Sequence, residues 1–213
     1  MSIANTYPPS NQSRIFLIRH GETAWALTGQ HTGRTDIPLT THGEVEAYNL
    51  GRLLATISFS QILCSPLKRA QQTCAACISG KSPVIIPELA EWDYGEYEGR
   101  RSADILQQRP NWNIYQDGCP GGESPEQIST RADNLIMRLH ESEGNIALFT
   151  HGQIGSAIGA RWINLPLVEA QHLSLSTASL SILSFDAHHP GVPVIALWNA
   201  TASTSPRESL TGN

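Results

Sequence analysis

The chain has 213 residues, 40% of them apolar, and its 19 acidic and 14 basic residues give a formal net charge of −5. This length and composition fit one domain with a full hydrophobic core, and the acidic balance argues against a broad surface for nucleic acid or an anionic membrane. Any affinity for phosphate must therefore be local.

The two ends of the chain differ in composition from the rest. The start has neither the basic nor the apolar run of a secretory signal, and no window approaches 18 uninterrupted apolar residues. We therefore expect a cytoplasmic protein with an N-terminal extension (1–13), one domain (14–199) and a flexible Ser- and Thr-rich tail (200–213). Whether it forms a homodimer stays open at this stage.

The first part of the predicted domain alternates strands and helices. An apolar run at residues 15–18 predicts a buried strand that stops at Arg19 and His20. Residues 41–44 read Thr-His-Gly-Glu, a capping-box pattern, and apolar residues follow at spacings of three, four and seven. We expect an amphipathic helix there, capped by the first of these residues. Residues 61–64 then predict a second short strand.

The middle of the chain continues this alternation before it becomes irregular. Ser65 and Pro66 predict a helix with serine at the cap and proline at the first position. A third strand is expected at residues 84–86, and the Gly- and aromatic-rich stretch 91–99 predicts a loop. Residues 111–122 contain several glycine and proline breakers and are a candidate wall or lid.

The last part of the predicted domain completes a layered fold. Residues 124–127 read Ser-Pro-Glu-Gln and begin a core-facing helix. A buried strand at 146–149 leads into an Ala- and Ile-rich helix, and strands at 180–185 and 194–198 finish the sheet at an edge. These units predict an α/β fold, a three-layer α/β/α sandwich whose mostly parallel sheet has helices on both faces.

Two histidines occupy the carboxyl ends of predicted strands, where sheets of this kind bind ligands. These are His20 and His151. Arg19, His20 and Gly21 together supply a cation, an imidazole and a backbone that can approach an anion closely, which suits phosphoryl transfer. For an isolated Arg-His pair, a strand that frays into polar surface would be the simpler interpretation.

Four motifs, in order along the chain, resemble the histidine phosphatase superfamily, which includes cofactor-dependent phosphoglycerate mutases. They are Leu17–Thr23, Ser65–Ala70, Glu91–Gly95 and Thr150–Gly152. The resemblance covers about residues 14–199 and is closest to the sugar-phosphatase branch with its sedoheptulose-bisphosphatase-like members. It implies a phosphomonoesterase that acts through a phosphohistidine intermediate on a small phosphorylated metabolite, a sugar phosphate in particular, without a metal or other cofactor.

The resemblance also implies roles for individual residues. His20 would be the nucleophile that becomes the phosphohistidine. Arg19 and Arg69 would hold phosphoryl oxygens bidentately, and His151 would be a third donor whose protonation state is open at this stage. Glu91 matches the family's general acid, which protonates the leaving alkoxide and later activates water.

Other site assignments are weaker. From spacing alone, Asp93 competes equally with Glu91 as the general acid. The candidate substrate-binding residues are Gln30, Thr32, Gly33, Tyr94 and Gly152. The first two are equally well explained as solvated turn residues. Tyr94 and Trp92 either line the pocket or pack beneath the loop, and packing is favoured for Trp92.

The sequence departs from the family at two places. Ala26 stands where many relatives have an asparagine that donates to phosphate, and Gln30 or Thr32 is a candidate replacement. Trp92 follows Glu91 where mutases typically place an arginine. Arg100 and Arg101 are the nearest substitutes, and solvation of a helix start is favoured over recognition of a second phosphate. Hydrolysis is therefore favoured over phosphoglycerate mutase activity. The remaining alternatives are a phosphohistidine-protein phosphatase and a non-enzymatic phosphate-binding module.

The remaining histidines and the cysteines receive lesser roles. His31, His42 and His140 lie in polar segments, and we expect them on the surface. Cys74 and Cys77 form a C-x-x-C pair without a second close pair of ligands, so free thiols are expected rather than a metal site.

Overall fold

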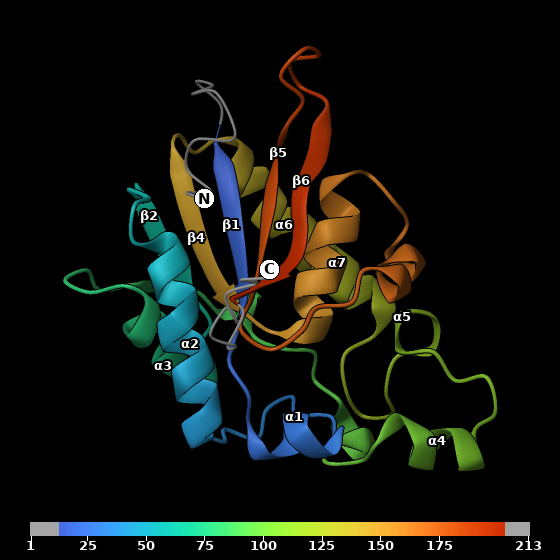
Figure 1. The fold of residues 1–213 in the computed structure, drawn as a ribbon. Helices are drawn as coiled ribbons and strands as arrows, with labels where there is room; N and C mark the ends of the chain where they lie inside the picture. The colour runs from blue at the N-terminus through green and yellow to red at the C-terminus, as the bar shows by residue number, and fades with distance from the viewer. Residues whose placement is uncertain (1–12, 203–213) are drawn as a thin grey trace, which may run out of the picture.

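Six strands form one mostly parallel sheet in the order β3-β2-β4-β1-β5-β6 in the computed structural model, which describes residues 13–202 (Figure 1). The strands are β1 (Arg14–Arg19), β2 (Gln61–Cys64), β3 (Val84–Ile85), β4 (Asn145–Thr150), β5 (Ser179–Phe185) and β6 (Pro193–Thr201). The first four strands pair only in parallel with one another, as β3 with β2, β2 with β4 and β4 with β1. The fifth strand, β5, pairs antiparallel with both of its neighbours, β1 and β6. The predicted strands and the mostly parallel sheet are confirmed.

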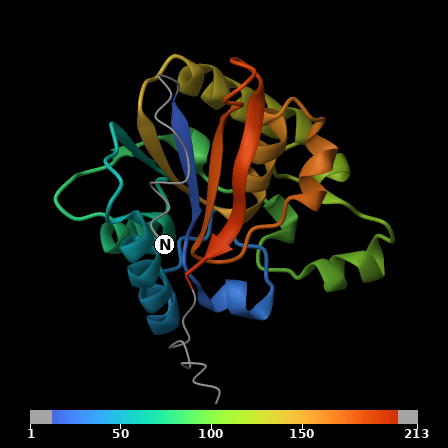
Figure 2. The ribbon, with the colours of Figure 1, turned by 45° about the horizontal axis from the view of Figure 1, so that its top comes forward.

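Helices cover both faces of the sheet, as Figures 1 and 2 show. The α-helices are α1 (Ala24–Thr28), α2 (Thr41–Leu54), α3 (Lys68–Cys77), α4 (Ser102–Gln108), α5 (Ile114–Asp117), α6 (Pro125–His140) and α7 (Gly152–Trp162). Three short 3-10 helices are η2 (Pro87–Leu89), η3 (Gly95–Tyr97) and η4 (Leu167–His172). α2 packs with α3 on one face and α6 with α7 on the other. The three-layer prediction is confirmed.

The alternation of side chains along β1 divides the core into two layers. Ile15 and Leu17 belong to the cluster that includes the apolar residues of α6 and α7, whereas Phe16 and Ile18 belong to the cluster with α2 and α3. All four are almost completely buried. Because successive side chains of a strand point to opposite faces, a continuous apolar run is what a doubly covered central strand requires.

Two predicted helix starts are wrong, and one is confirmed. The cap of α2 is Thr40, whose hydroxyl accepts from the Gly43 N–H, so the expected cap was one residue late. α3 does not begin at Ser65 and Pro66 but at Lys68, after a residue that makes no side-chain cap. α6 begins as predicted, because Ser124 and the N3 glutamine complete a capping box.

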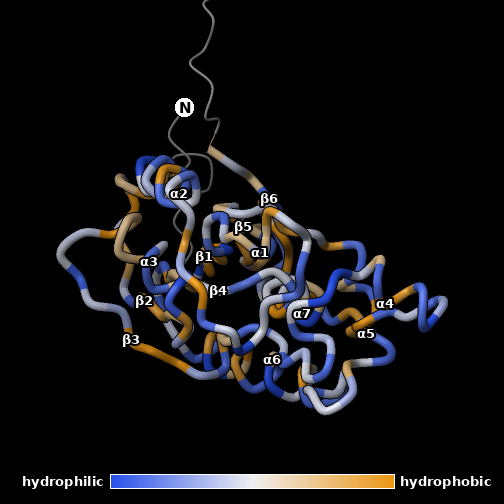
Figure 3. The backbone as a smooth tube through the Cα atoms, turned by 90° about the horizontal axis from the view of Figure 1, so that it is seen from below, coloured by the Kyte–Doolittle hydropathy of each residue, from blue (hydrophilic) through white to orange (hydrophobic). Residues whose placement is uncertain are grey.

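Short helices and irregular segments lie at the edge of the sheet where the parallel strands end. α1, α4 and α5 lie at this edge in Figure 1, and Figure 3 looks onto it from below. The irregular segment 111–122 contains α5 and contributes residues to a cavity wall there, as the sequence predicted. The expected N-terminal extension and tail lie largely outside the described residues, and β6 continues to Thr201.

All four cysteines are free thiols, as expected. Within residues 13–202, no three His, Cys, Asp or Glu side chains come together in a way that would hold a metal ion. None of the helices in that range is both long and apolar enough to cross a bilayer.

Candidate active site

The register of the sheet brings the two predicted histidines together. β1 and β4 are neighbours with Arg19 opposite Thr150, so His20 and His151 follow at the same level. The His20 N–H donates to the Thr150 carbonyl at 3.0 Å, and the two imidazole centroids are 5.1 Å apart. Both side chains are buried. Two residues far apart in sequence thus share one site because their strands are parallel neighbours.

The His20 imidazole is held in one orientation. Its Nδ1 lies 2.7 Å from the Gly21 carbonyl oxygen, which only accepts, so Nδ1 carries the proton and Nε2 keeps its lone pair. Burial lowers the pKa of His20 well below its usual value, and Arg19 and Arg69 lower it further. A neutral imidazole with a free Nε2 is the form that can attack phosphorus.

Gly21 lets the backbone approach an anion closely, and it is also required for the packing of the turn after β1. A Cβ on this residue would lie 2.4 Å from the Gly43 carbonyl oxygen, so the turn after β1 touches the first turn of α2 directly. The Gly21 N–H donates to the Thr73 hydroxyl of α3 at 3.0 Å. The turn that carries His20 is therefore fixed by both helices on that face of the sheet.

Arg69 is completely buried, and its guanidinium is largely committed to protein acceptors. Its Nε–H donates to Nδ1 of His151 at 3.1 Å. Its Nη groups donate to the carbonyls of Thr32, Gly33 and Thr35 at 2.8 to 3.1 Å. The structure therefore places Arg69 behind His151 and the loop at residues 32–35, and it is not among the residues that line the cavity.

His151 is neutral in this arrangement. Its Nδ1 accepts from Arg69, so the ring proton is on Nε2, which lies 2.7 Å from the Ser65 hydroxyl. Burial lowers the pKa of His151 well below its usual value, and Arg69, His20 and Arg19 add to that effect. Ser65, expected to cap a helix, belongs to the site instead.

Glu91 lies at the cavity and caps α7. Its carboxylate accepts from the N–H groups of Trp92, Gln153 and Ile154 at 2.9 to 3.0 Å, the last two from the first turn of the helix. A carboxylate at a helix N-terminus also meets the positive end of the helix dipole. Asp93, its sequence competitor, pairs instead with Arg34 at 2.7 Å and is not a cavity-lining residue.

Arg19 faces a cavity of about 480 Å³ together with His20 and Glu91. One of its Nη groups donates to the Leu175 carbonyl, whereas its buried Nε has no hydrogen-bond partner among the described residues. Burial lowers the pKa of Arg19, and Glu91 opposes this shift. Gly152 lies beside both side chains, since a Cβ there would be 3.5 Å from the Arg19 guanidinium and 3.7 Å from Glu91.

Four of the five candidate substrate-binding residues line this cavity. They are Gln30, Thr32, Tyr94 and Gly152. Gln30 Nε2 already donates to the Gly99 carbonyl, and the Thr32 hydroxyl donates to the Gln30 carbonyl, so neither points to an obvious replacement for the amide missing at Ala26. The fifth, Gly33, lies outside the lining, and its N–H donates to the Glu98 carboxylate.

Two aromatic predictions have different outcomes. Trp92 is completely buried and donates its indole N–H to the Glu123 carbonyl at 2.9 Å, which confirms packing beneath the loop. The surface prediction for His31 is wrong, because its ring stacks on Tyr94 at 4.6 Å and lines the cavity. Burial lowers the pKa of His31 to about 4. His42 and His140 are exposed as expected.

The far wall of the cavity holds apolar and aromatic side chains beside the polar Ser102 and Asn113, and the sequence predicted only that residues 111–122 would contribute to it. The side chains that form it include Leu106, Trp112, Ile114 and Tyr115, from α4, α5 and the turn between them. The Tyr115 hydroxyl donates to Gln153 on α7, which joins this wall to the Glu91 side of the cavity.

Arg100 and Arg101 do not take part in the cavity lining. Arg100 donates to Gln108 at 2.8 Å, and Arg101 pairs with Asp104 at 2.9 Å, both on α4. This agrees with the favoured expectation that they serve the start of a helix.

Comparisons with known proteins identify the family of this chain. The model of the histidine phosphatase superfamily (branch 1) matches residues 15–201. An acid phosphatase of Mycobacterium tuberculosis is 36% identical over 91% of this chain and 95% of its own length. A sedoheptulose 1,7-bisphosphatase of Saccharomyces cerevisiae is 34% identical over 74% of this chain and 70% of its own. A solved structure of a Mycobacterium tuberculosis open-reading-frame product superposes with a TM-score of 0.83 at 35% identity, covering 90% of this chain and 99% of that one.

Proposed function

The protein belongs to branch 1 of the histidine phosphatase superfamily and is a phosphatase, and we propose that it hydrolyses a small phosphate monoester through a phosphohistidine formed on His20. The observation that carries the mechanism is the pair of buried imidazoles 5.1 Å apart at the ends of two parallel strands. His20 lines the cavity with Arg19 and Glu91, whereas the fully buried His151 lies next to His20 and is not among the lining residues.

In the first step, Nε2 of His20 attacks phosphorus and the bond from phosphorus to the ester oxygen breaks. Nδ1 keeps its proton, which it donates to the Gly21 carbonyl oxygen, so the lone pair on Nε2 is available at neutral pH. Arg19, with its buried and unpartnered Nε, supports the phosphoryl oxygens by charge-assisted hydrogen bonds. The departing alkoxide takes a proton from the Glu91 carboxyl group.

In the second step, water attacks the phosphorus of the phosphohistidine, and the bond from phosphorus to Nε2 breaks. Glu91, now a carboxylate, takes a proton from that water and is ready for the next cycle. His151 is neutral and is not a second cation, and its single N–H, on Nε2, reaches a phosphoryl oxygen only by leaving the Ser65 hydroxyl. Arg69 acts on the phosphate indirectly, by holding His151 and the loop at residues 32–35.

The far wall supports a monophosphate whose alcohol part is uncharged, such as a sugar monophosphate. Leu106, Trp112 and Ile114 offer apolar surface, and His31 is held neutral above about pH 4. A second phosphate placed against these side chains would lose hydration without gaining a cation.

The proposal is tested by trapping the intermediate. Purified protein is mixed with a radiolabelled monoester in the presence of EDTA, quenched in base and assayed for acid-labile phosphate on histidine. We expect labelling and turnover in the wild type, neither in His20→Ala, and both in the matched exposed control His42→Ala. Equal turnover by His20→Ala would overturn the mechanism, and loss of turnover in EDTA would overturn its independence from metal.

The same assay separates the alternatives. Isomerisation of a phosphoglycerate faster than phosphate release would favour the mutase, and selective release from phosphohistidine peptides would favour a protein phosphatase. Binding of inorganic phosphate without any turnover would favour the phosphate-binding module.

A further inference from the structure

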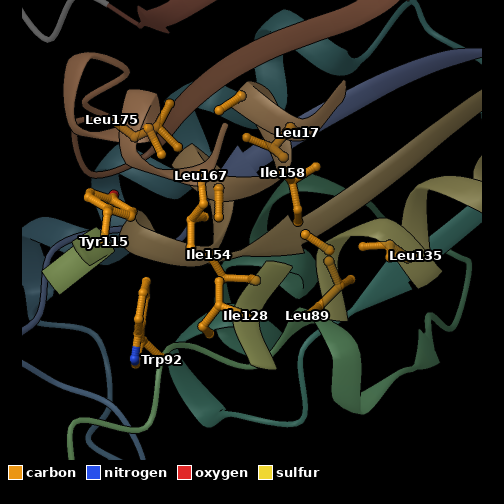
Figure 4. Packing of buried hydrophobic residues seen from close by; sticks show 14 of the residues in the cluster. Leu17, Leu89, Trp92, Tyr115, Ile128, Leu135, Ile154, Ile158, Leu167 and Leu175 are labelled. Atoms are coloured by element: carbon orange, nitrogen blue, oxygen red, sulfur yellow. The ribbon is translucent and has the colours of Figure 1, made fainter. Parts of the chain in front are cut away.

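The segment that presents Glu91 has no regular secondary structure, yet it is held on both sides. It follows η2, which packs against α6, and it precedes η3. Leu89 and Trp92, on either side of Glu91, are completely buried and pack in the same cluster as Ile128 of α6 (Figure 4). The buried Thr150 hydroxyl donates to the Leu89 carbonyl at 2.9 Å. Apolar packing therefore fixes where the segment lies.

The orientation of the backbone at Glu91 depends on one cation. Arg131, in the second turn of α6, is 15% exposed at its side chain. Its Nη1 donates to the carbonyls of Glu88 and Ala90 at 2.9 and 2.5 Å, and its Nη2 lies 3.5 Å from the Glu91 carbonyl oxygen. A guanidinium can hold several carbonyls at fixed angles because its N–H groups form a rigid planar fork. Arg131 therefore orients three of the four carbonyl groups from Glu88 to Glu91, the last of which belongs to the general acid itself.

Glu123 holds the other side of the segment and neutralises the same cation. Its carboxylate lies 2.8 Å from Arg131 Nη2 and accepts from the Asp93 N–H at 2.9 Å. Its backbone N–H donates to the Asp93 carbonyl, and its carbonyl accepts from the Trp92 indole. The ion pair thus bridges the residues before Glu91 to those after it, although neither partner lines the cavity.

We infer that Arg131 and Glu123 are a positioning pair for the general acid, which hold the Glu91 carboxyl group at the distance and angle from which it protonates the leaving oxygen. This inference rests on the proposed function, because it requires Glu91 to be the proton donor. The pair touches neither the phosphoryl group nor His20. Its loss displaces the acid while the nucleophile and Arg19 stay in place.

A displaced acid has a specific kinetic signature. An alkyl phosphate needs protonation of its poor leaving group, whereas p-nitrophenolate leaves without a proton. General acid catalysis contributes about 10²- to 10⁴-fold, and a misplaced catalytic group forfeits much of that factor. Loss of the pair must therefore slow alkyl esters far more than the nitrophenyl ester.

The test compares kcat/KM of Arg131→Met on a sugar monophosphate and on p-nitrophenyl phosphate. We expect a loss of roughly ten- to a hundredfold on the sugar ester and less than about threefold on the nitrophenyl ester. The matched control is Arg138→Met on the same helix, whose exposed guanidinium pairs with the side chain of Glu88 but with none of these carbonyls. It should leave both rates unchanged.

A double-mutant cycle shows whether the pair acts through Glu91. In a Glu91→Gln background, Arg131→Met should reduce the rate on the sugar ester by less than about twofold further. Glu123→Gln keeps both backbone contacts to the segment and removes only the charge, so we expect a smaller loss with the same preference for the sugar ester. If Arg131→Met does not fold, Glu123→Gln alone tests the positioning role, by the same comparison of kcat/KM on the sugar ester and on the nitrophenyl ester.

Equal losses on both esters, or full additivity with Glu91→Gln, would overturn the positioning role and leave Arg131 as a structural residue. These outcomes are distinct from failure of the proposed function, because wild-type labelling of His20 is measured in the same preparation. An unlabelled wild type defeats the proposed function itself.

Discussion

The Nε–H of Arg69 donates to Nδ1 of His151 at 3.1 Å, and this hydrogen bond determines which nitrogen of His151 carries the ring proton. With Nδ1 occupied as an acceptor, the proton lies on Nε2, where the Ser65 hydroxyl is its partner at 2.7 Å. Arg69 also holds three loop carbonyls, so one buried side chain fixes an imidazole and a loop together.

Substitution Arg69→Lys should therefore damage both stability and activity. An ammonium acts as a point charge and cannot replace a planar fork that serves four acceptors. Because an unsatisfied buried polar group costs about 1 to 3 kcal/mol, we expect the free energy of unfolding to fall by about 3 kcal/mol and kcat to fall by at least about tenfold. Urea denaturation and steady-state kinetics measure the two effects, with the exposed Arg52→Lys as control. Retention of wild-type values would show that the fork is dispensable.

The stability of the protein should decrease as the pH falls below about 6.5. The pKa values of His20, His151 and His31 are lowered in the folded state, so below pH 6.5 the unfolded chain binds protons that the folded chain does not. For His31, with its folded pKa of about 4, the loss is complete near that pH and reaches up to about 3 kcal/mol.

Urea unfolding of the wild type and of His31→Gln at pH 7 and pH 4.5 isolates the contribution of His31. The difference between the two pH values should be smaller in the variant. An equal difference in both proteins would mean that burial of His31 does not depress its pKa.

Two glycine substitutions should separate packing from catalysis. A Cβ at Gly33 would lie 2.5 Å from the Trp92 carbonyl oxygen, so Gly33→Ala should lower the free energy of unfolding by about 1 to 3 kcal/mol. At Gly152 the nearest atoms are 3.5 Å away, so Gly152→Ala should fold normally. Its new methyl group faces Arg19 and Glu91, and we expect KM for the monoester to rise. Unchanged kinetics in Gly152→Ala would remove that residue from the substrate site.

Substitution Leu106→Arg should change the preference for the leaving group. Leu106 lines the far wall and is 41% exposed on α4, so a longer charged side chain fits there without disturbing the core. We expect the ratio of kcat/KM for a sugar bisphosphate to kcat/KM for the sugar monophosphate to rise by roughly fivefold. This is the change that one favourable ion pair of about 1 kcal/mol at a partly exposed site would cause. Leu106→Gln is the neutral control. A ratio that does not move, or moves equally in the control, would mean that the second phosphate does not reach this wall.

Local sequence patterns were sufficient to predict the sheet and to place the two histidines at the same edge of it. The apolar runs before His20 and His151 predicted buried parallel strands, because a strand covered on both faces has no polar side. The carboxyl-end rule for such sheets then predicted a common site, and Glu91 and Arg19 followed from the family resemblance. Capping patterns were less reliable: Ser124 caps α6 as predicted, whereas the hydroxyl of Ser65 bonds His151 at the end of the neighbouring strand.

The sequence by itself determined the fold class, since this depends on the order of apolar and polar residues along single strands, and the resemblance of its motifs to the family predicted His20 as the nucleophile. The tertiary structure alone decided how the side chains of the site contact one another. The tautomer of His151, the burial of His31 on Tyr94 and the hold of Arg131 on the Glu91 segment all join residues from separate elements. A side-chain donor such as a guanidinium could bond any of several acceptors. Which acceptor it bonds depends on distances between elements of the folded chain and not on spacing along the sequence.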